Sequence, residues 1–136
     1  MQFQPELKCK ALPKWGKYLR GQWEERFAAH LSPKKKKEIY LKSYLWHLCS
    51  YEETAFLSGE AAVAAFEKQP KEKCTIFFEL HNDAYLIENA ATLTASVLLP
   101  VADEDVYVMD WNGQWTFMNT HEKNLGPYFI ERKKNA

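Results

Sequence analysis

Residues that mark recognisable active sites are scarce in this sequence. The three cysteines, Cys9, Cys49 and Cys74, are widely spaced and form no CxxC pair, so neither a disulfide framework nor a zinc site is predicted, and a reducing cytoplasm is the expected compartment. The five glycines stand singly, and the patterns GxSxG, GxGxxG and the P-loop are absent. The four histidines show neither HxxxH nor HExxH spacing. We therefore expect no metal and no cofactor.

Long apolar runs and an excess of one charge are also missing. No stretch approaches the roughly 18 apolar residues of a membrane-spanning helix, and residues 1–6 lack the basic and apolar regions of a signal peptide. Eighteen basic residues balance eighteen acidic ones, whereas nucleic-acid binding needs a basic surface. We predict no membrane association and no general nucleic-acid binding.

Aromatic residues, by contrast, are plentiful. They make up 15% of the 136 residues, and hydrophobic residues as a whole make up 46%, which is enough to bury one substantial core. Large rings fill protein cores, but tryptophan and tyrosine are also enriched at binding surfaces. Both uses of the rings stay open at this point.

Apolar spacing predicts helices in the first half of the chain. Residues three and four apart form one apolar stripe on a helix that starts at Gly16, namely Tyr18, Leu19, Trp23, Phe27 and Leu31. Ser32 can cap a second helix that has Pro33 at its first position, and we expect this helix to end near Ser50. Ser58 is the expected cap of a third helix over 60–68, which ends before Pro70.

Apolar spacing changes to every second residue beyond residue 70. The segments 74–80 and 85–87 flank a turn at 81–84 and predict a hairpin. The segments 105–110 and 114–119 flank Asn112-Gly113, the pair typical of a type I′ hairpin turn, and this register places Val108 opposite Phe117 and Tyr107 opposite Met118.

These segments define the expected fold class. A further strand at 128–130 is expected at the sheet edge, whereas 89–99 fits either a helix or a strand. We predict an α+β fold in which about three N-terminal helices cover one face of a C-terminal, mainly antiparallel sheet. The predicted organisation is an irregular arm at 1–14, one domain at 15–131 and a frayed tail at 132–136.

One short segment draws attention as a candidate site. Thr120-His121-Glu122 directly follows a predicted strand, where a rigid support displays side chains, and His121 with Glu122 could act as an acid–base pair. The same residues could equally hydrogen-bond a buried loop or contact a partner. The carboxylates Asp103, Glu104, Asp105 and Asp110 suit either a hard cation or, as we expect, a solvated loop.

Three segments together resemble a known family. They are 45–51 (LWHLCSY), 85–90 (YLIENA) and 105–129, which includes VYVMD, WTF, THE and GPYF. In order and spacing they resemble the bacterial family catalogued as domain of unknown function 4275, over about residues 15–130. The resemblance implies a stand-alone cytosolic bacterial protein and brings no activity, substrate or cofactor.

Two functions follow as hypotheses. The first is a non-enzymatic protein-binding module, for example an immunity or antitoxin-like protein, and the second is a small enzyme with catalytic candidates His121, Glu122 and His47. The predicted binding residues are Trp46, Tyr51, Glu88, Asn89, Asp110, Trp115 and Tyr128. The expected partner is another protein or a second copy of the chain in a homodimer.

Overall fold

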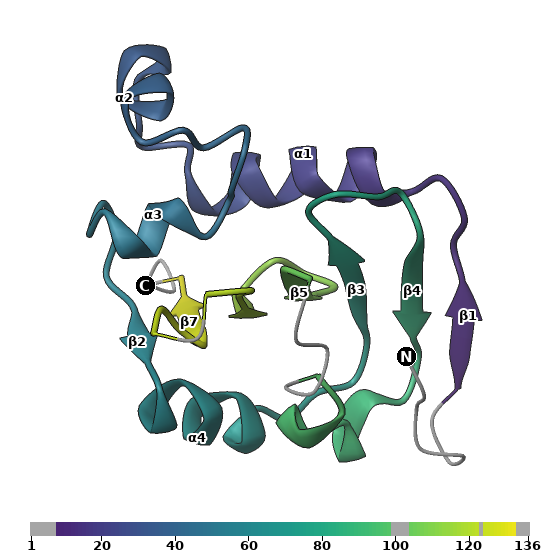
Figure 1. The fold of residues 1–136 in the computed structure, drawn as a ribbon. Helices are drawn as coiled ribbons and strands as arrows, with labels where there is room; N and C mark the ends of the chain where they lie inside the picture. The colour runs from purple at the N-terminus through teal and green to yellow at the C-terminus, as the bar shows by residue number, and fades with distance from the viewer. Residues whose placement is uncertain (1–7, 99–103, 123, 133–136) are drawn as a thin grey trace.

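A seven-stranded sheet organises the described residues, 8–98, 104–122 and 124–132, of the computed structural model (Figure 1). The strands are β1 (Cys9–Ala11), β2 (Leu57–Ser58), β3 (Cys74–Phe78), β4 (Ala84–Ile87), β5 (Val106–Asp110), β6 (Trp115–Asn119) and β7 (Tyr128–Glu131). The helices are α1 (Gly16–Phe27), α2 (Pro33–Glu38), α3 (His47–Ser50) and α4 (Glu60–Lys68), with two 3-10 turns, η1 (Ala90–Thr92) and η2 (Ala95–Val97). None of these helices is long and apolar enough to span a bilayer.

The sheet is antiparallel throughout, in the order β1-β4-β3-β5-β6-β7-β2, and the predicted α+β class is confirmed. The predicted hairpin of β3 and β4 forms, and β5 pairs with β6 in the predicted register, with Val108 opposite Phe117 and Tyr107 opposite Met118. β7 is not an edge strand as predicted, because β2 pairs with its outer side.

The turn between β5 and β6 differs from the predicted type I′ turn. Only Gly113 has a positive φ, of 69°, while Asn112 does not, and the Gly113 amide donates to the Asp110 carbonyl at 2.9 Å. The connection therefore spans residues 111–114 rather than two residues. The positive φ of Gly113 explains the need for glycine, and a Cβ there would also lie 2.3 Å from Cδ of the Arg26 side chain.

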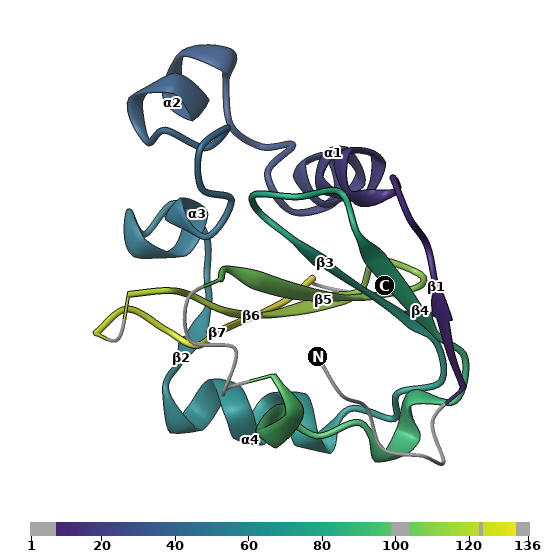
Figure 2. The ribbon, with the colours of Figure 1, turned by 45° about the vertical axis from the view of Figure 1, so that its right-hand side comes forward.

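Helices cover both faces of the sheet, so the prediction that they cover one face is wrong. α1 and α3 lie on one side, and α4 with η1 and η2 lies on the other (Figures 1 and 2). Because successive strand residues point to opposite faces, Phe77 joins a core cluster with Trp23 of α1, and Ile76 joins a second cluster with Phe66 of α4. All five residues of β3 are buried, and four of them are apolar, which is typical of a strand covered on both faces.

The predicted stripe of α1 is largely confirmed. Leu19, Trp23 and Phe27 are buried, and the Trp23 indole N–H donates to the Thr116 hydroxyl at 2.9 Å, which ties the helix to β6. Tyr18 instead faces solvent, and Leu31 lies beyond the end of the helix.

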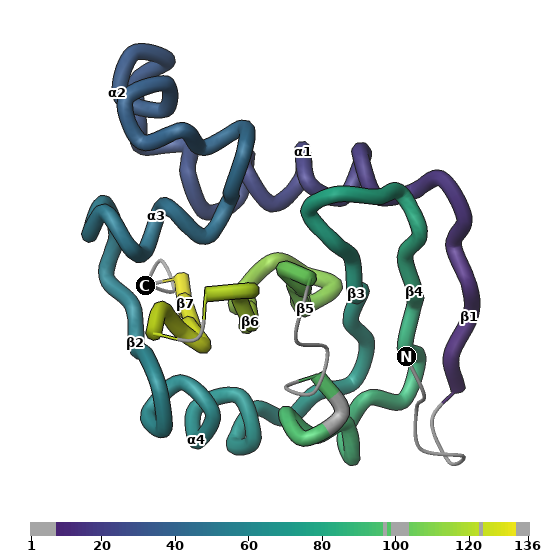
Figure 3. The backbone as a smooth tube through the Cα atoms, viewed as in Figure 1, coloured from purple at the N-terminus to yellow at the C-terminus, as the bar shows by residue number. Residues whose placement is uncertain are grey.

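The predicted helix over 33–50 is instead two short helices, α2 and α3, joined by a turn (Figure 3). The Ser32 cap is confirmed, since its hydroxyl accepts the Lys35 amide. After α2, Tyr40 adopts a φ of 56°, the Tyr40 amide donates to the Lys37 carbonyl, and the Leu41 amide donates to the Lys36 carbonyl. This is a Schellman motif, which ends a helix. Burial of the Ile39 and Leu41 side chains stabilises this interruption of the helix.

Three smaller predictions also need correction, and the alternative left open for residues 89–99 is resolved. The arm at 1–14 is not irregular throughout, because β1 pairs with β4. Ser58 lies in β2, and Gly59 occupies the cap position of α4 without a side-chain bond. The ambiguous segment 89–99 forms η1 and η2 as far as it is described. Arg132 is not frayed, since its amide donates to the Gln114 carbonyl at 2.8 Å, whereas 133–136 lie outside the described residues.

Candidate functional site

Four half-exposed rings form a row on the surface between α3 and the end of β6. Tyr51 lies 5.1 Å from His47, His47 lies 5.0 Å from Tyr44, and Tyr44 lies 5.6 Å from His121, measured between ring centroids. We call these four residues the ring row. Trp46 is buried behind them, with its ring 4.6 Å from that of His47 and 6.0 Å from that of His121.

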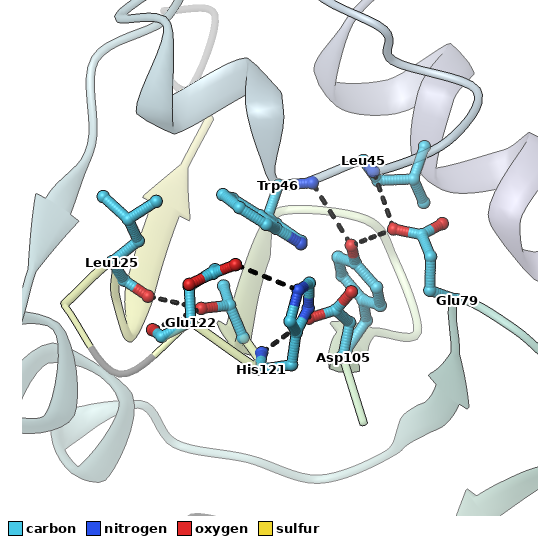
Figure 4. A network of polar contacts seen from close by, with 9 residues as sticks. Leu45, Trp46, Glu79, Asp105, His121, Glu122 and Leu125 are labelled. Carbon is cyan, nitrogen blue, oxygen red and sulfur yellow. Dashed lines mark hydrogen bonds and ion pairs between the residues drawn. The ribbon is translucent and has the colours of Figure 1, made fainter. Parts of the chain in front are cut away.

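A buried carboxylate fixes the orientation of His121 in the ring row. Asp105 Oδ1 accepts both the His121 backbone amide at 2.7 Å and the His121 Nδ1–H at 2.8 Å, and the Asp105 side chain is only 2% exposed. On the other side of the imidazole, Nε2 lies 3.3 Å from Oε1 of the exposed Glu122 (Figure 4). The hydrogen bond with Asp105 raises the pKa of His121, and both carboxylates attract its positive charge.

A second polar cluster holds the chain before α3 against the sheet. Tyr107 is fully buried, and its hydroxyl donates to Glu79 Oε1 at 2.5 Å. The same Glu79 oxygen accepts the Leu45 amide at 2.8 Å, and the Tyr107 oxygen accepts the Trp46 amide at 3.2 Å (Figure 4). Burial raises the pKa of Glu79 to about 7, against the opposing effect of these hydrogen bonds. This cluster fixes the backbone of residues 45 and 46, which lie between Tyr44 and His47 of the ring row.

Five of the residues singled out in the sequence meet at this place, although the chain brings them from two separate segments. They are Trp46, His47, Tyr51, His121 and Glu122. His121 and Glu122 contact each other, whereas neighbouring residues after a strand usually diverge. The sequence did not indicate Tyr44, Asp105 as a partner of His121, or Glu79. The one signal in the sequence for a buried role of Glu79 was its position directly after the apolar segment that forms β3.

The other predicted site residues lie elsewhere. Glu88 and Asn89 follow β4, where the Asn89 side-chain oxygen accepts the Lys8 amide at 2.6 Å. Asp110 accepts the Gln114 amide in the β5–β6 turn. Trp115 stacks on Phe129 in one core cluster, and Tyr128 packs against Phe56 in the other. Both rings are core residues.

The acidic residues before and within β5 separate rather than gather. Glu104 contacts His81 at 2.9 Å, Asp105 holds His121, and Asp110 caps the turn, while Asp103 lies outside the described residues. Within the described ranges, no three histidine, cysteine or carboxylate side chains are grouped so that they could hold a metal ion. The geometry therefore gives the hard-cation alternative no support.

The comparison with protein families assigns nearly the whole chain. The family model described as Domain of unknown function (DUF4275) matches residues 2–129. The chain belongs to this family. The resemblance noted in the sequence is therefore confirmed, and the ring row lies wholly inside the DUF4275 region. No curated protein and no solved structure matches the chain.

The DUF4275 assignment brings no activity with it, so the chemistry of the site must be read from its geometry. His121 is aligned by a buried carboxylate, as a general base would be. However, Nε2 faces the Glu122 carboxylate rather than a hydroxyl or thiol, and His121 lines none of the five cavities that stand out among the described residues. The candidate site is a half-exposed aromatic surface whose rings contact one another.

Proposed function

We propose that the protein is a non-enzymatic protein-binding module and that the ring row is the centre of its contact surface. The observation that carries the proposal is the continuous contact of Tyr51, His47, Tyr44 and His121 across two chain segments. Rings that are already held in place lose little conformational entropy on binding, and aromatic residues dominate the energetics of protein interfaces. Tyr51 is 47% exposed and is the most accessible of the row.

The lysines of α2 favour a partner with an acidic surface. Lys35 joins α2 to the segment after α3 through Glu53 at 3.2 Å, and Lys36 pairs with Glu24 at 3.5 Å. Lys34 and Lys37 are exposed and form no ion pair with any described residue. α2 buries none of its residues and stands away from the sheet in both ribbon views (Figures 1 and 2). Such charges at the rim of an interface chiefly accelerate association.

Matched single variants test this surface. Wild type, Tyr51→Ala, Lys37→Glu and the control Tyr18→Ala, which removes an exposed tyrosine from α1, are used to capture proteins from lysate of the source cells, with quantitative mass spectrometry. We expect a protein that Tyr51→Ala loses and Tyr18→Ala retains. With the purified partner, Tyr51→Ala should weaken binding by about 30-fold if the ring contributes about 2 kcal/mol. Lys37→Glu should mainly slow association. Equal capture by all four proteins would refute the proposal.

Two finer forms of the proposal can be separated by the same reagents. An immunity or antitoxin-like protein should capture a toxic enzyme and abolish its activity in a stoichiometric mixture. A homodimer should instead sediment as a dimer in the wild type and as a monomer in Tyr51→Ala. We place the function in the cytoplasm, which is consistent with Cys9, Cys49 and Cys74 all being free thiols.

An enzyme centred on His121 is the second candidate, favoured by the alignment of its imidazole on Asp105 at 2.8 Å. The described cysteines are not activated as nucleophiles for it: burial raises the pKa of Cys9 and of Cys49, and raises that of Cys74 to about 12, which favours the thiol forms. A panel of ester, amide and phosphate substrates tests this candidate. Turnover that His121→Gln abolishes would favour it over the binding module.

A further inference from the structure

A separate cavity of about 250 Å³ lies between α1 and the end of β5. Three exposed rings line it: Trp15 is 44% exposed, Tyr18 57% and Trp111 45%. Trp15 and Tyr18 make an edge-to-face contact with centroids 5.5 Å apart. We call this space the Trp15–Trp111 cavity. It shares no residue with the ring row.

Positive charge exceeds negative charge around this cavity. Arg26 lines it and donates to the Trp111 carbonyl at 3.4 Å, but it pairs with no carboxylate among the described residues. Its side chain runs beside Gly113, where a Cβ on the glycine would lie 2.3 Å from the Arg26 Cδ. Lys73 Nζ lies 4.0 Å from the Trp111 ring centroid, which adds a second cation. Asp110 is the one carboxylate in the lining, and its Oδ2 already accepts the Gln114 amide.

A buried hydroxyl without a partner also lines the cavity. Thr75 of β3 is 3% exposed, and its Oγ1 has no hydrogen-bond partner among the described residues. Buried polar groups in folded proteins are nearly always satisfied by protein, water or ligand. The Thr75 side chain lines the cavity while its Oγ1 is covered, so rotation of this side chain would present the hydroxyl to a ligand in the cavity.

We propose that the Trp15–Trp111 cavity binds a small molecule made of one aromatic ring and a short acidic side chain. Its size suits this class, because a cavity of about 150 Å³ holds benzene, and the remaining volume accommodates a carboxylate. The rings of Trp15, Tyr18 and Trp111 contact the ligand ring. Arg26 takes the carboxylate, since a guanidinium can donate two parallel hydrogen bonds to its oxygens. The Thr75 hydroxyl supplies a further donor at the cavity wall.

Three probes that share a phenyl ring on a two-carbon chain, and that end in a carboxylate, a hydroxyl or an ammonium group, test the class. Phenylacetate, 2-phenylethanol and 2-phenylethylamine are titrated into the full chain by calorimetry, with ligand-observed NMR as a second readout. We expect saturable binding of phenylacetate with a Kd of about 1 mM or lower, the range open to ligands of this size. The alcohol should bind at least tenfold more weakly and the amine more weakly still. Equal binding of the three, or no saturable binding because water alone fills the cavity, would overturn the proposal.

Variants assign the effect to the cavity. Arg26→Met should lower the affinity for phenylacetate to that for 2-phenylethanol and leave the affinity for 2-phenylethanol unchanged. The control Lys42→Met, which removes an exposed lysine, should change neither affinity. Thr75→Val keeps the shape of the side chain and should weaken phenylacetate at least threefold without lowering the melting temperature. It therefore decides the question if Arg26→Met fails to fold. Tyr51→Ala should bind phenylacetate like the wild type, so failure here and failure of the protein-binding proposal are distinguishable. Unaltered binding by Arg26→Met or Thr75→Val would place the ligand elsewhere.

Discussion

Replacement of Glu79 by glutamine should make the protein more stable at neutral and alkaline pH. The Glu79 carboxyl is 8% exposed, and one of its oxygens accepts both the Leu45 amide and the Tyr107 hydroxyl. The amide oxygen of glutamine can accept the same two hydrogen bonds. The substitution therefore removes the buried charge while it keeps the contacts that hold residues 45 and 46.

The size of the effect follows from the pKa of Glu79, which burial raises from an ordinary value of 4.5 to about 7. The folded protein holds this proton more tightly than the unfolded chain, so stability is highest below 4.5 and falls as the pH rises toward 7. At about 1.4 kcal/mol per pH unit, the full loss is about 3 kcal/mol. Above pH 7, Glu79→Gln should therefore be more stable than the wild type by up to about 3 kcal/mol, and near pH 4 the two should be alike.

Urea unfolding of both proteins between pH 4 and pH 8.5, followed by tryptophan fluorescence, measures this difference directly. His121 also has a raised pKa, and its contribution is lost in the same direction, but it is present in both proteins and cancels in the comparison. Glu25→Gln, on the exposed side of α1, makes the same chemical change in solvent and serves as the control. The reasoning fails if Glu79→Gln is less stable than the wild type at pH 8.5, because Glu79 would then be a stabilising charge.

Two further predictions concern the backbone. In α1, Gly21→Ala should raise the unfolding free energy by about 0.5–1 kcal/mol, since a Cβ there meets nothing within 4 Å. Gly16→Ala in the same helix should destabilise, because its Cβ would lie 2.6 Å from the Asn82 Cα; equal effects of the two substitutions in urea unfolding would contradict this packing. Glu52→Gly, at a φ of 56° after α3, should stabilise by up to about 1 kcal/mol in thermal unfolding, and a lower melting temperature would argue against the left-handed conformation.

The hairpins and the α+β class were predictable because their signals are local. Asn112-Gly113 and the alternation around it were enough to set the register of β5 and β6, even though the turn type was wrong. The break between α2 and α3 was not predictable in the same way. Tyr40 and Glu52 have the left-handed backbone conformation that glycine usually adopts at the end of a helix. Burial of the flanking apolar side chains compensates for the free-energy cost of this conformation.

The candidate site was predictable only in part. His121 and Glu122 could be singled out from their place after a strand, and Trp46, His47 and Tyr51 from the family-like segment. Their contact depends on Asp105 and Glu79, which act across the sheet through pairs far apart in sequence. No local pattern encodes such partners. Trp115 and Tyr128 show the converse difficulty, because a ring in a core and a ring on a binding surface look alike in sequence.

The order of the strands disfavours pairing of the sheet edges between molecules. Its two edge strands are β1, whose three residues are exposed and include Lys10, and β2, which is only two residues long. Short edge strands, and edge strands that carry a lysine, are poor templates for a further strand. Removal of residues 8–12 would uncover β4, whose apolar sequence Ala84–Ile87 would then form the edge. The shortened chain should therefore form fibrils at concentrations at which the intact chain remains in solution. Light scattering measures this difference.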